Sequence, residues 1–151
     1  MGIEENKAIV QRFSDRFGRG DNSVLDELMT DDFVLHGLRY GGGEFGKDVL
    51  ARTNTGGHAG FPDYSMTTFD MIAEGDKVMS IAKRTGTQTG EFVGIPPTGK
   101  SVTIYRFWLY KIENGKIAEM WGMDDTLGQF QQLGVIPSQP EFIQAYINSL
   151  K

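Results

Sequence analysis

Cysteine is absent from the 151 residues, and histidine occurs only twice, at His36 and His58. The lack of cysteine excludes disulfide bonds, thiol nucleophiles and thiolate metal ligands. Two histidines at unrelated positions give little support for a histidine metal site, so we expect neither a metal nor a cofactor. Any catalysis must therefore use side-chain oxygen and nitrogen.

Basic runs and long apolar stretches are missing as well. The chain carries 15 Lys and Arg against 20 Asp and Glu, a formal charge of −5, which gives no electrostatic footprint for nucleic acid or for a membrane surface. No stretch approaches the roughly 18 apolar residues of a membrane span, and Met1–Lys7 lacks the pattern of a secretion signal. We expect one cytoplasmic domain over residues 1–151, without nucleic-acid or membrane partners.

The strongest local pattern is a β-hairpin, with predicted strands Ser101–Ile112 and Lys116–Met123 joined at Asn114 and Gly115. Asn-Gly between apolar runs favours a tight turn, because both turn positions need positive φ. Side chains alternate between the two faces of a strand. One face of the second strand carries Ala118, Met120, Gly122 and Asp124. We expect any reaction centre to lie near Asp124.

The remaining elements follow from hydrophobic spacing. Helical spacing predicts helices near residues 3–17, 24–29, 44–54, 127–133 and 140–150, and alternation predicts strands at 33–38, 65–73 and 77–88. The glycine-rich stretch 56–62 is interpreted as a mobile loop at the pocket rim. Helices followed by a strongly bent antiparallel sheet indicate an α+β fold. Such a sheet leaves a cone-shaped pocket at one end, whose apolar walls favour a small hydrophobic ligand.

Several runs resemble the SnoaL-like polyketide cyclases, also called the ester cyclase family. They are residues 89–100 with Gly-Ile-Pro-Pro-Thr-Gly, residues 110–121, residues 125–134, and in the amino-terminal half residues 6–10 and 32–36. The resemblance implies a nuclear transport factor 2-like fold, a cone-shaped α+β barrel of bent sheet with packed helices, and commonly a homodimer through the sheet. It also implies intramolecular aldol closure of a polyketide ester by a pocket carboxylate, without metal or cofactor.

One departure from the family lies on the predicted site strand. The family usually ends this strand with Glu-His-Trp-Asp, whose His and Asp face the pocket, whereas this chain has Glu-Met-Trp-Gly at residues 119–122. Asp124 keeps the same face about 7 Å further along, which makes it the candidate acid–base residue. The alternative interpretation is that Asp124 and Asp125 both cap the helix that follows; Asp125 matches the family's usual aspartate before Leu-Gly.

Two further residues are candidate catalytic helpers of Asp124. His36 matches the histidine that often follows Asp-Phe-Val in the family, and its alternative role is that of a histidine with one buried hydrogen bond. Arg106 either lines the pocket, where it stabilises an oxyanion or pairs with Asp124, or meets an acidic partner in a dimer interface. Arg84 raises the same question on its own strand.

The candidate substrate-binding residues share aromatic or thioether side chains, which suit a flat apolar ligand. They are Trp108, Tyr110, Met120, Trp121, Tyr40 and Phe61. Two functions fit the whole pattern. The first is a cofactor-independent cyclase, lyase or isomerase acting on an apolar carbonyl compound, and an epoxide hydrolase using Asp and Arg would share its residues. The second is a non-catalytic domain that binds a hydrophobic small molecule and has lost the family's acid–base residues, as Met120 and Gly122 suggest.

Overall fold

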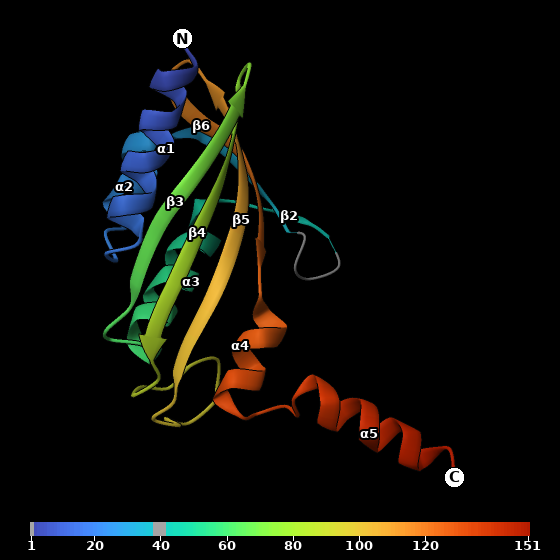
Figure 1. Cartoon of the computed structure of the whole chain (residues 1–151). Helices are drawn as coiled ribbons and strands as arrows, with labels where there is room; N and C mark the ends of the chain where they lie inside the picture. The colour runs from blue at the N-terminus through green and yellow to red at the C-terminus, as the bar shows by residue number, and fades with distance from the viewer. Residues whose placement is uncertain (1, 38–41) are drawn as a thin grey trace.

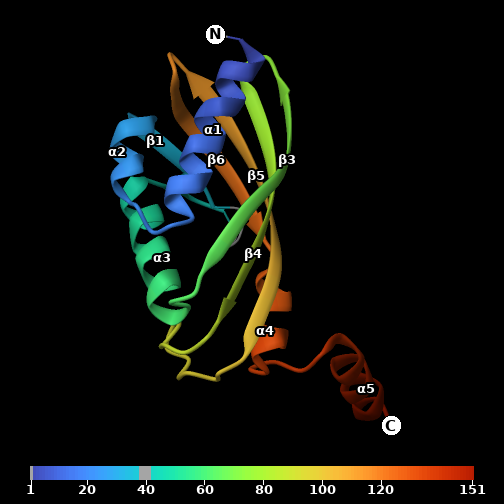
Figure 2. The same ribbon diagram turned by 60° about the vertical axis from the view of Figure 1, so that its left-hand side comes forward.

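The computed structural model describes residues 2–37 and 42–151. The helices are α1 Ile3–Phe17, α2 Ser23–Leu28, α3 Lys47–Gly60, α4 Thr126–Leu133 and α5 Gln139–Ser149. The strands are β1 Met29–His36, β2 Glu44–Phe45, β3 Ser65–Glu74, β4 Lys77–Thr87, β5 Ser101–Glu113 and β6 Lys116–Asp124. Figures 1 and 2 show a curved sheet with α1, α2 and α3 gathered on one side, which we call its inner face.

The six strands are ordered β2-β1-β6-β5-β4-β3. Neighbours from β3 to β6 are antiparallel, whereas β1 runs parallel to β6, with Met29 beside Ile117 and His36 beside Trp121. The α+β class and the bent sheet are confirmed. The sheet is mixed rather than wholly antiparallel, because a long connection leaves the direction of β1 free of any tight turn. It is also open, with β2 and β3 at its edges, so the expected barrel closure is wrong.

The predicted hairpin of β5 and β6 is confirmed. Asn114 and Gly115 have φ angles of 48° and 78°, as a tight turn with two positive φ values requires. The register places Arg106 beside Asp124 and Tyr110 beside Met120. Alternate residues of the two strands therefore face α1 and α3 together.

The glycine-rich stretch that was expected to be a loop is helical through Gly60, so that expectation is wrong for most of its length. Residues 44–45 form β2, and α3 begins only at Lys47. A Cβ on Gly60 would lie 2.7 Å from the Cβ of Phe92, so this turn needs glycine to pack closely. Packing against the rest of the protein overrides the low helix propensity of glycine.

The core lies between α1 and the inner face of the sheet. Phe13 and Phe17 of α1 are buried and stack at 5.1 Å between ring centroids. Phe13 also packs on Trp108 and Tyr110 of β5, with centroids 6.4 and 5.8 Å away. These aromatic contacts fix the distance between α1 and the sheet.

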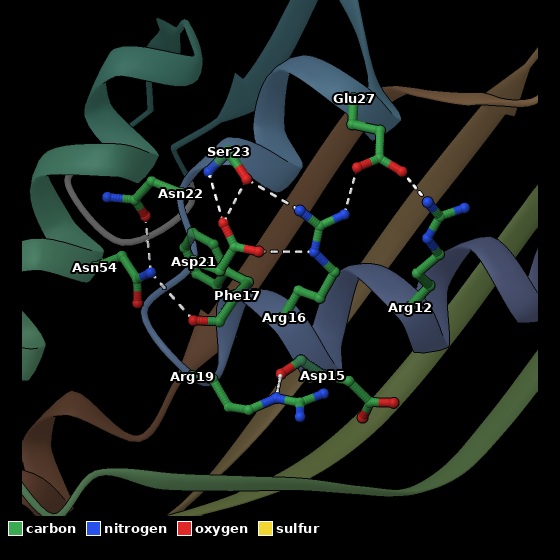
Figure 3. Close-up of polar contacts among 10 residues, drawn as sticks. All are labelled: Arg12, Asp15, Arg16, Phe17, Arg19, Asp21, Asn22, Ser23, Glu27 and Asn54. Carbon is green, nitrogen blue, oxygen red and sulfur yellow. Dashed lines mark hydrogen bonds and ion pairs between the residues drawn. The ribbon is translucent and has the colours of Figure 1, made fainter.

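Polar contacts fix the helices to one another (Figure 3). Arg16 donates to Asp21 at 2.7 Å and to Ser23 at 3.0 Å, and it also pairs with Glu27 of α2. Asn54 of α3 donates from its Nδ2 to the carbonyl of Phe17 at 3.1 Å and to Asn22 Oδ1 at 2.8 Å. The side chain of Asn54 therefore holds α3 against the turn that follows α1.

The carboxyl-terminal part of the chain differs in its packing. Gln132 of α4 bonds to both the N–H and the carbonyl of Thr103, so α4 is tied to β5. In contrast, α5 projects away from the sheet in both views, and every residue of it is exposed. Among the helices of residues 2–37 and 42–151, none is long and apolar enough to cross a membrane.

Candidate functional site

A cavity of about 310 Å³ lies between the inner face of the sheet, α3 and α4. This volume falls at the lower end of the range for small-molecule sites, about 300–1,000 Å³. Its apolar walls include Leu35, Phe45, Val49, Leu50, Trp108 and Met120. Its polar groups include Tyr64, Arg84, Arg106, Asp124 and Gln129.

Asp124 is the last residue of β6, and its side chain is only 4% exposed. Arg106 donates from Nε to Oδ1 at 2.8 Å and from Nη2 to Oδ2 at 3.0 Å, a bidentate pair between neighbouring strands. The indole Nε1 of Trp108 donates to Oδ1 at 3.0 Å. These donors stabilise the charged form of the carboxylate within the cavity wall.

The cap of α4 is Asp125, whose Oδ1 accepts from the N–H of Gly128 at 2.8 Å. The two adjacent aspartates thus have different environments. Asp125 caps the helix, as the sequence suggested, and the Asp124 carboxylate turns into the cavity instead of joining the cap.

Arg106 lines the cavity and pairs with Asp124, one of the two placements that the sequence left open. Burial disfavours its charge, but the nearby Asp124 and the Tyr64 hydroxyl outweigh that cost and raise the pKa of Arg106 above its ordinary value. Its Nη1 donates to the Tyr64 hydroxyl at 2.8 Å, and its guanidinium lies 4.2 Å from the centroid of the Trp108 ring. The side chain is therefore held on several sides.

The position of Trp108 depends on Gly122. A Cβ built on Gly122 would lie 2.8 Å from Trp108 Nε1 and 3.0 Å from its Cδ1. The glycine thus leaves the space in which the indole reaches Asp124. The buried carboxylate of Asp124 lies two residues further along the same strand.

Sequence reasoning gave little weight to Arg84 and missed Gln129, although both line the cavity and are about 95% buried. Arg84 Nη1 donates to Gln129 Oε1 at 3.5 Å. The Arg84 guanidinium lies 4.9 Å from the centroid of Phe61 and 4.7 Å from that of Tyr64. Strand parity places Arg84 on the inner face, but no sequence signal places Gln129 beside it.

His58 lies in the last turn of α3, with its ring centroid 4.5 Å from that of Tyr64. Burial, followed by the positive charge of Arg84, lowers the pKa of His58 below its ordinary value. The site therefore disfavours a positive charge on this imidazole.

His36 borders the same cavity as Asp124, but the contacts of its ring lie elsewhere. His36 pairs with Glu119 at 2.8 Å and stacks on Trp121 at 4.4 Å with an interplanar angle of 6°. Register places these side chains on the outer face of the sheet, opposite to Met120 and Asp124. Hydrogen bonds from His36 and Lys111 lower the pKa of Glu119. His36 is thus part of an outer-face network.

The predicted substrate-binding residues divide into two groups. Trp108 and Met120 line the cavity. Tyr110 is buried in the core, where burial raises its pKa to about 12, and Phe61 is buried against Val102 and Leu133. Trp121 lies on the outer face beside His36. None of these last three is among the residues that line the cavity, because core packing and strand parity direct them elsewhere. Tyr40 lies outside the described residues.

Within residues 2–37 and 42–151 there is no group of three or more His, Asp or Glu side chains that could hold a metal ion. The polar groups among the described lining residues include a carboxylate, guanidinium groups, carboxamides and a phenol. This set can exchange protons and stabilise charge on oxygen.

Comparison with known proteins identifies the family. The sequence profile of the SnoaL-like polyketide cyclases matches residues 7–133. The chain belongs to this family. A comparison with curated protein sequences gave no match.

Solved structures agree with this membership. AclR from Streptomyces galilaeus, a proposed hydroxylase, is 25% identical over 99% of this chain and 93% of its own, with a TM-score of 0.82. A protein from Jannaschia sp. CCS1, assigned as a SnoaL-like polyketide cyclase, is 27% identical over 91% of this chain and 97% of its own, with a TM-score of 0.77. IdmH from Streptomyces antibioticus, a proposed polyketide cyclase, is 26% identical over 85% of this chain and 98% of its own, with a TM-score of 0.75. The fold is thus that of the SnoaL-like proteins, the nuclear transport factor 2-like fold.

Proposed function

We propose that this SnoaL-like protein is a cofactor-independent enzyme that performs acid–base chemistry on an apolar carbonyl compound, with intramolecular aldol closure as the reaction. The observation that carries the proposal is the Asp124 carboxylate, 4% exposed in the wall of a cavity with largely apolar lining. Family membership supports the same class of reaction. His36 has no part in the proposed chemistry, because its partners are Glu119 and Trp121.

The proposed reaction needs one base and two carbonyl groups held in contact. Asp124 takes a proton from the carbon beside one carbonyl, and the resulting enolate attacks the carbon of the second carbonyl. The new alkoxide then recovers the proton from Asp124, so that protons and electrons balance. The apolar walls would hold the reacting groups together and limit water, and Arg106 and Trp108 would keep the carboxylate charged and oriented.

The first step can be tested without the natural substrate. In heavy water, a base that removes a proton from the carbon beside a carbonyl leaves an enolate, which takes up deuterium in place of that proton. NMR follows this exchange in the bicyclic ketone 2-tetralone. We expect the wild-type protein to accelerate the exchange, and Asp124→Asn to reduce the acceleration by about 100-fold or more. The melting temperature of this variant is expected to fall, because Arg106 loses its charged partner, so the exchange is compared at a temperature at which circular dichroism shows both proteins folded.

Asp125→Asn is the matched control, because it removes the neighbouring carboxylate while asparagine still caps α4. We expect this variant to exchange deuterium at the wild-type rate. Equal rates for Asp124→Asn and the wild type would exclude Asp124 as the base.

A specific observation favours a second candidate, the non-catalytic binding domain. Both oxygens of Asp124 accept hydrogen bonds from Arg106, and Gly122 replaces the usual aspartate of the family. A carboxylate so well satisfied is a weaker base. If this candidate is correct, 2-tetralone binds to the wild-type protein without faster exchange and is recovered unaltered.

We also propose that the chain forms a homodimer through the outer face of its sheet. Phe69, Tyr105, Phe107 and Met123 on this face are each about half exposed. Tyr105 and Phe69 meet edge to face at 6.1 Å, and Phe107 is paired with Met123, so the patch is continuous. Half-exposed aromatic side chains present about 100 Å² each. The resulting area of about 400 Å² is about half of the roughly 800 Å² that one partner contributes to a stable dimer, so the patch would form the apolar centre of the interface.

A further inference from the structure

The buried charges among the described lining residues of the cavity are the guanidinium groups of Arg84 and Arg106 and the carboxylate of Asp124. Arg52 also borders the cavity, but it is 75% exposed and pairs with Asp48. Arg106 directs Nε and Nη2 to Asp124 and Nη1 to Tyr64. Arg84 adds a second buried cation on the same inner face, where charge interactions are stronger than in water.

The guanidinium of Arg84 is held in a defined orientation. It lies against two aromatic rings, at 4.9 Å from the centroid of Phe61 and 4.7 Å from that of Tyr64. Arginine held against aromatic rings is well suited to planar recognition of an oxyanion, because its N–H groups form a rigid fork. The same charge contributes to the lowered pKa of His58, so it acts across the end of α3.

Gln129 supplies an additional donor at this point. The Oε1 atom of Gln129 accepts a hydrogen bond from Arg84 Nη1. The amide nitrogen Nε2 of Gln129 is therefore not the atom that contacts Arg84. The Nε2 atom is buried and has no hydrogen-bond partner among the described residues, although Gln129 is 96% buried and lines the cavity. A buried amide donor without an acceptor costs free energy until a ligand supplies one.

We infer that Arg84 and Gln129 form an anion subsite, which accepts a negatively charged oxygen carried by an apolar ring compound. The inference rests on the proposed function of the cavity as a ligand site. The oxygen has two sources with the same chemistry. It is either a carboxylate present on the ligand before reaction, or the enolate oxygen that forms when Asp124 removes a proton.

Two probes of nearly equal shape test the subsite, 2-naphthoate and its neutral analogue 2-naphthamide. Their affinities are measured by isothermal titration calorimetry. We expect the wild-type protein to bind the carboxylate at least about tenfold more tightly than the amide. Arg84→Met is expected to remove this preference while leaving the affinity for the amide unchanged.

Lys83→Met is the matched control, because Lys83 precedes Arg84 on β4 but is exposed on the outer face. It removes the same charge from the chain and is expected to keep the preference for the carboxylate. Gln129→Glu is a second variant at the subsite itself, in which an acceptor replaces the donor. It is expected to weaken 2-naphthoate binding by more than tenfold and provides the test if Arg84→Met does not fold.

A further measurement distinguishes the two sources of the anion. If the enolate is recognised, Arg84→Met slows deuterium exchange of the neutral ketone 2-tetralone without weakening its binding. If a carboxylate of the ligand is recognised, only the affinity for 2-naphthoate falls. Any of three results would overturn the subsite. The wild-type protein would bind the two probes equally well, or it would not bind 2-naphthoate at millimolar concentration, or Lys83→Met and Arg84→Met would lose the preference for the carboxylate equally. Binding of 2-naphthoate needs no turnover. A failure of the Asp124→Asn exchange experiment would therefore not decide whether the anion subsite exists.

Discussion

The hydrogen bond from Trp108 to Asp124 depends on the lack of a side chain at Gly122. Even the smallest side chain there would lie within 2.8 Å of the indole nitrogen. The glycine and the aspartate two residues later are therefore linked, because one makes room for the donor and the other is its acceptor. The orientation of the cavity carboxylate therefore depends on the absence of a side chain two residues earlier on the same strand.

We predict that Gly122→Ala displaces the Trp108 ring and breaks its bond to Asp124. Overpacking and a lost hydrogen bond together are expected to lower the free energy of unfolding by about 1–3 kcal/mol. Urea unfolding measures this loss, and tryptophan fluorescence reports the displaced ring.

A double-mutant cycle with Trp108→Phe checks the assigned cause. If the indole is the obstacle, Gly122→Ala lowers the free energy of unfolding much less in the Trp108→Phe background. The reason is that phenylalanine lacks the indole nitrogen, the atom nearest to a Cβ at position 122. Fully additive losses would show that Gly122 is needed for another reason.

Individual residues show which parts of the site the sequence could predict. The Asn-Gly turn was sufficient to predict the hairpin, but the register that follows from the turn holds only as far as the pair Ile112 and Ile117. A β-bulge beyond that pair shifts the register by one residue and places Arg106 beside Asp124, and no local pattern predicted this shift. Parity could not separate Trp108, which reaches the cavity, from Tyr110, which α1 covers. Gln129 lies on a different element, and its place depends on how α4 packs, which no local pattern encodes.

Among the elements, α3 contributes most to the cavity, and two consecutive glycines on it differ in role. Gly57 is buried and lines the cavity, whereas Gly56 is exposed. A Cβ on either would meet no atom within 4 Å. Glycine in a helix costs about 0.5–1 kcal/mol relative to alanine, so the bare backbone at Gly57 keeps space open at the expense of helix stability.

We predict that Gly57→Leu fills the cavity and lowers the affinity for 2-tetralone by at least about tenfold. Calorimetric titration measures this loss. Gly56→Leu makes the same change of helix propensity on the exposed side and is expected to leave binding intact. Both variants are expected to melt at or above the wild-type temperature. If both bind like the wild type, the ligand does not occupy the cavity beside α3.

Elements with strong local signals were predictable, and those governed by packing were not. The β5–β6 hairpin carries its own turn chemistry in Asn114 and Gly115. The carboxyl-terminal half of α3 lacks such a signal, because its glycines favour a loop in isolation. Its helical form depends on close contacts such as Gly60 with Phe92. The direction of β1 beside β6 likewise follows from assembly of the whole sheet.

For the whole molecule, the proposed dimer predicts a simple response to charge on the outer face. Phe107→Lys places a cation in the middle of the apolar patch, and we expect it to convert a dimer to a monomer at micromolar concentration. Sedimentation equilibrium measures the molecular mass. Val93→Lys is the control, because Val93 is 71% exposed but lies in a loop away from the sheet. A monomeric wild-type protein would contradict the proposal.

The parallel pairing of β1 with β6 also has a consequence for the order of folding. Strands β3 to β6 follow one another and can pair through contacts close in sequence, whereas β1 must wait for the last strand of the sheet. Asp124 and Met120 lie on that last strand. During synthesis β1 therefore has only the short strand β2 beside it until β6 has left the ribosome. A chain that ends before β6 lacks both the Asp124 carboxylate and the strand that joins β1 to the rest of the sheet. A folded sheet is therefore expected only in chains that also carry this site residue.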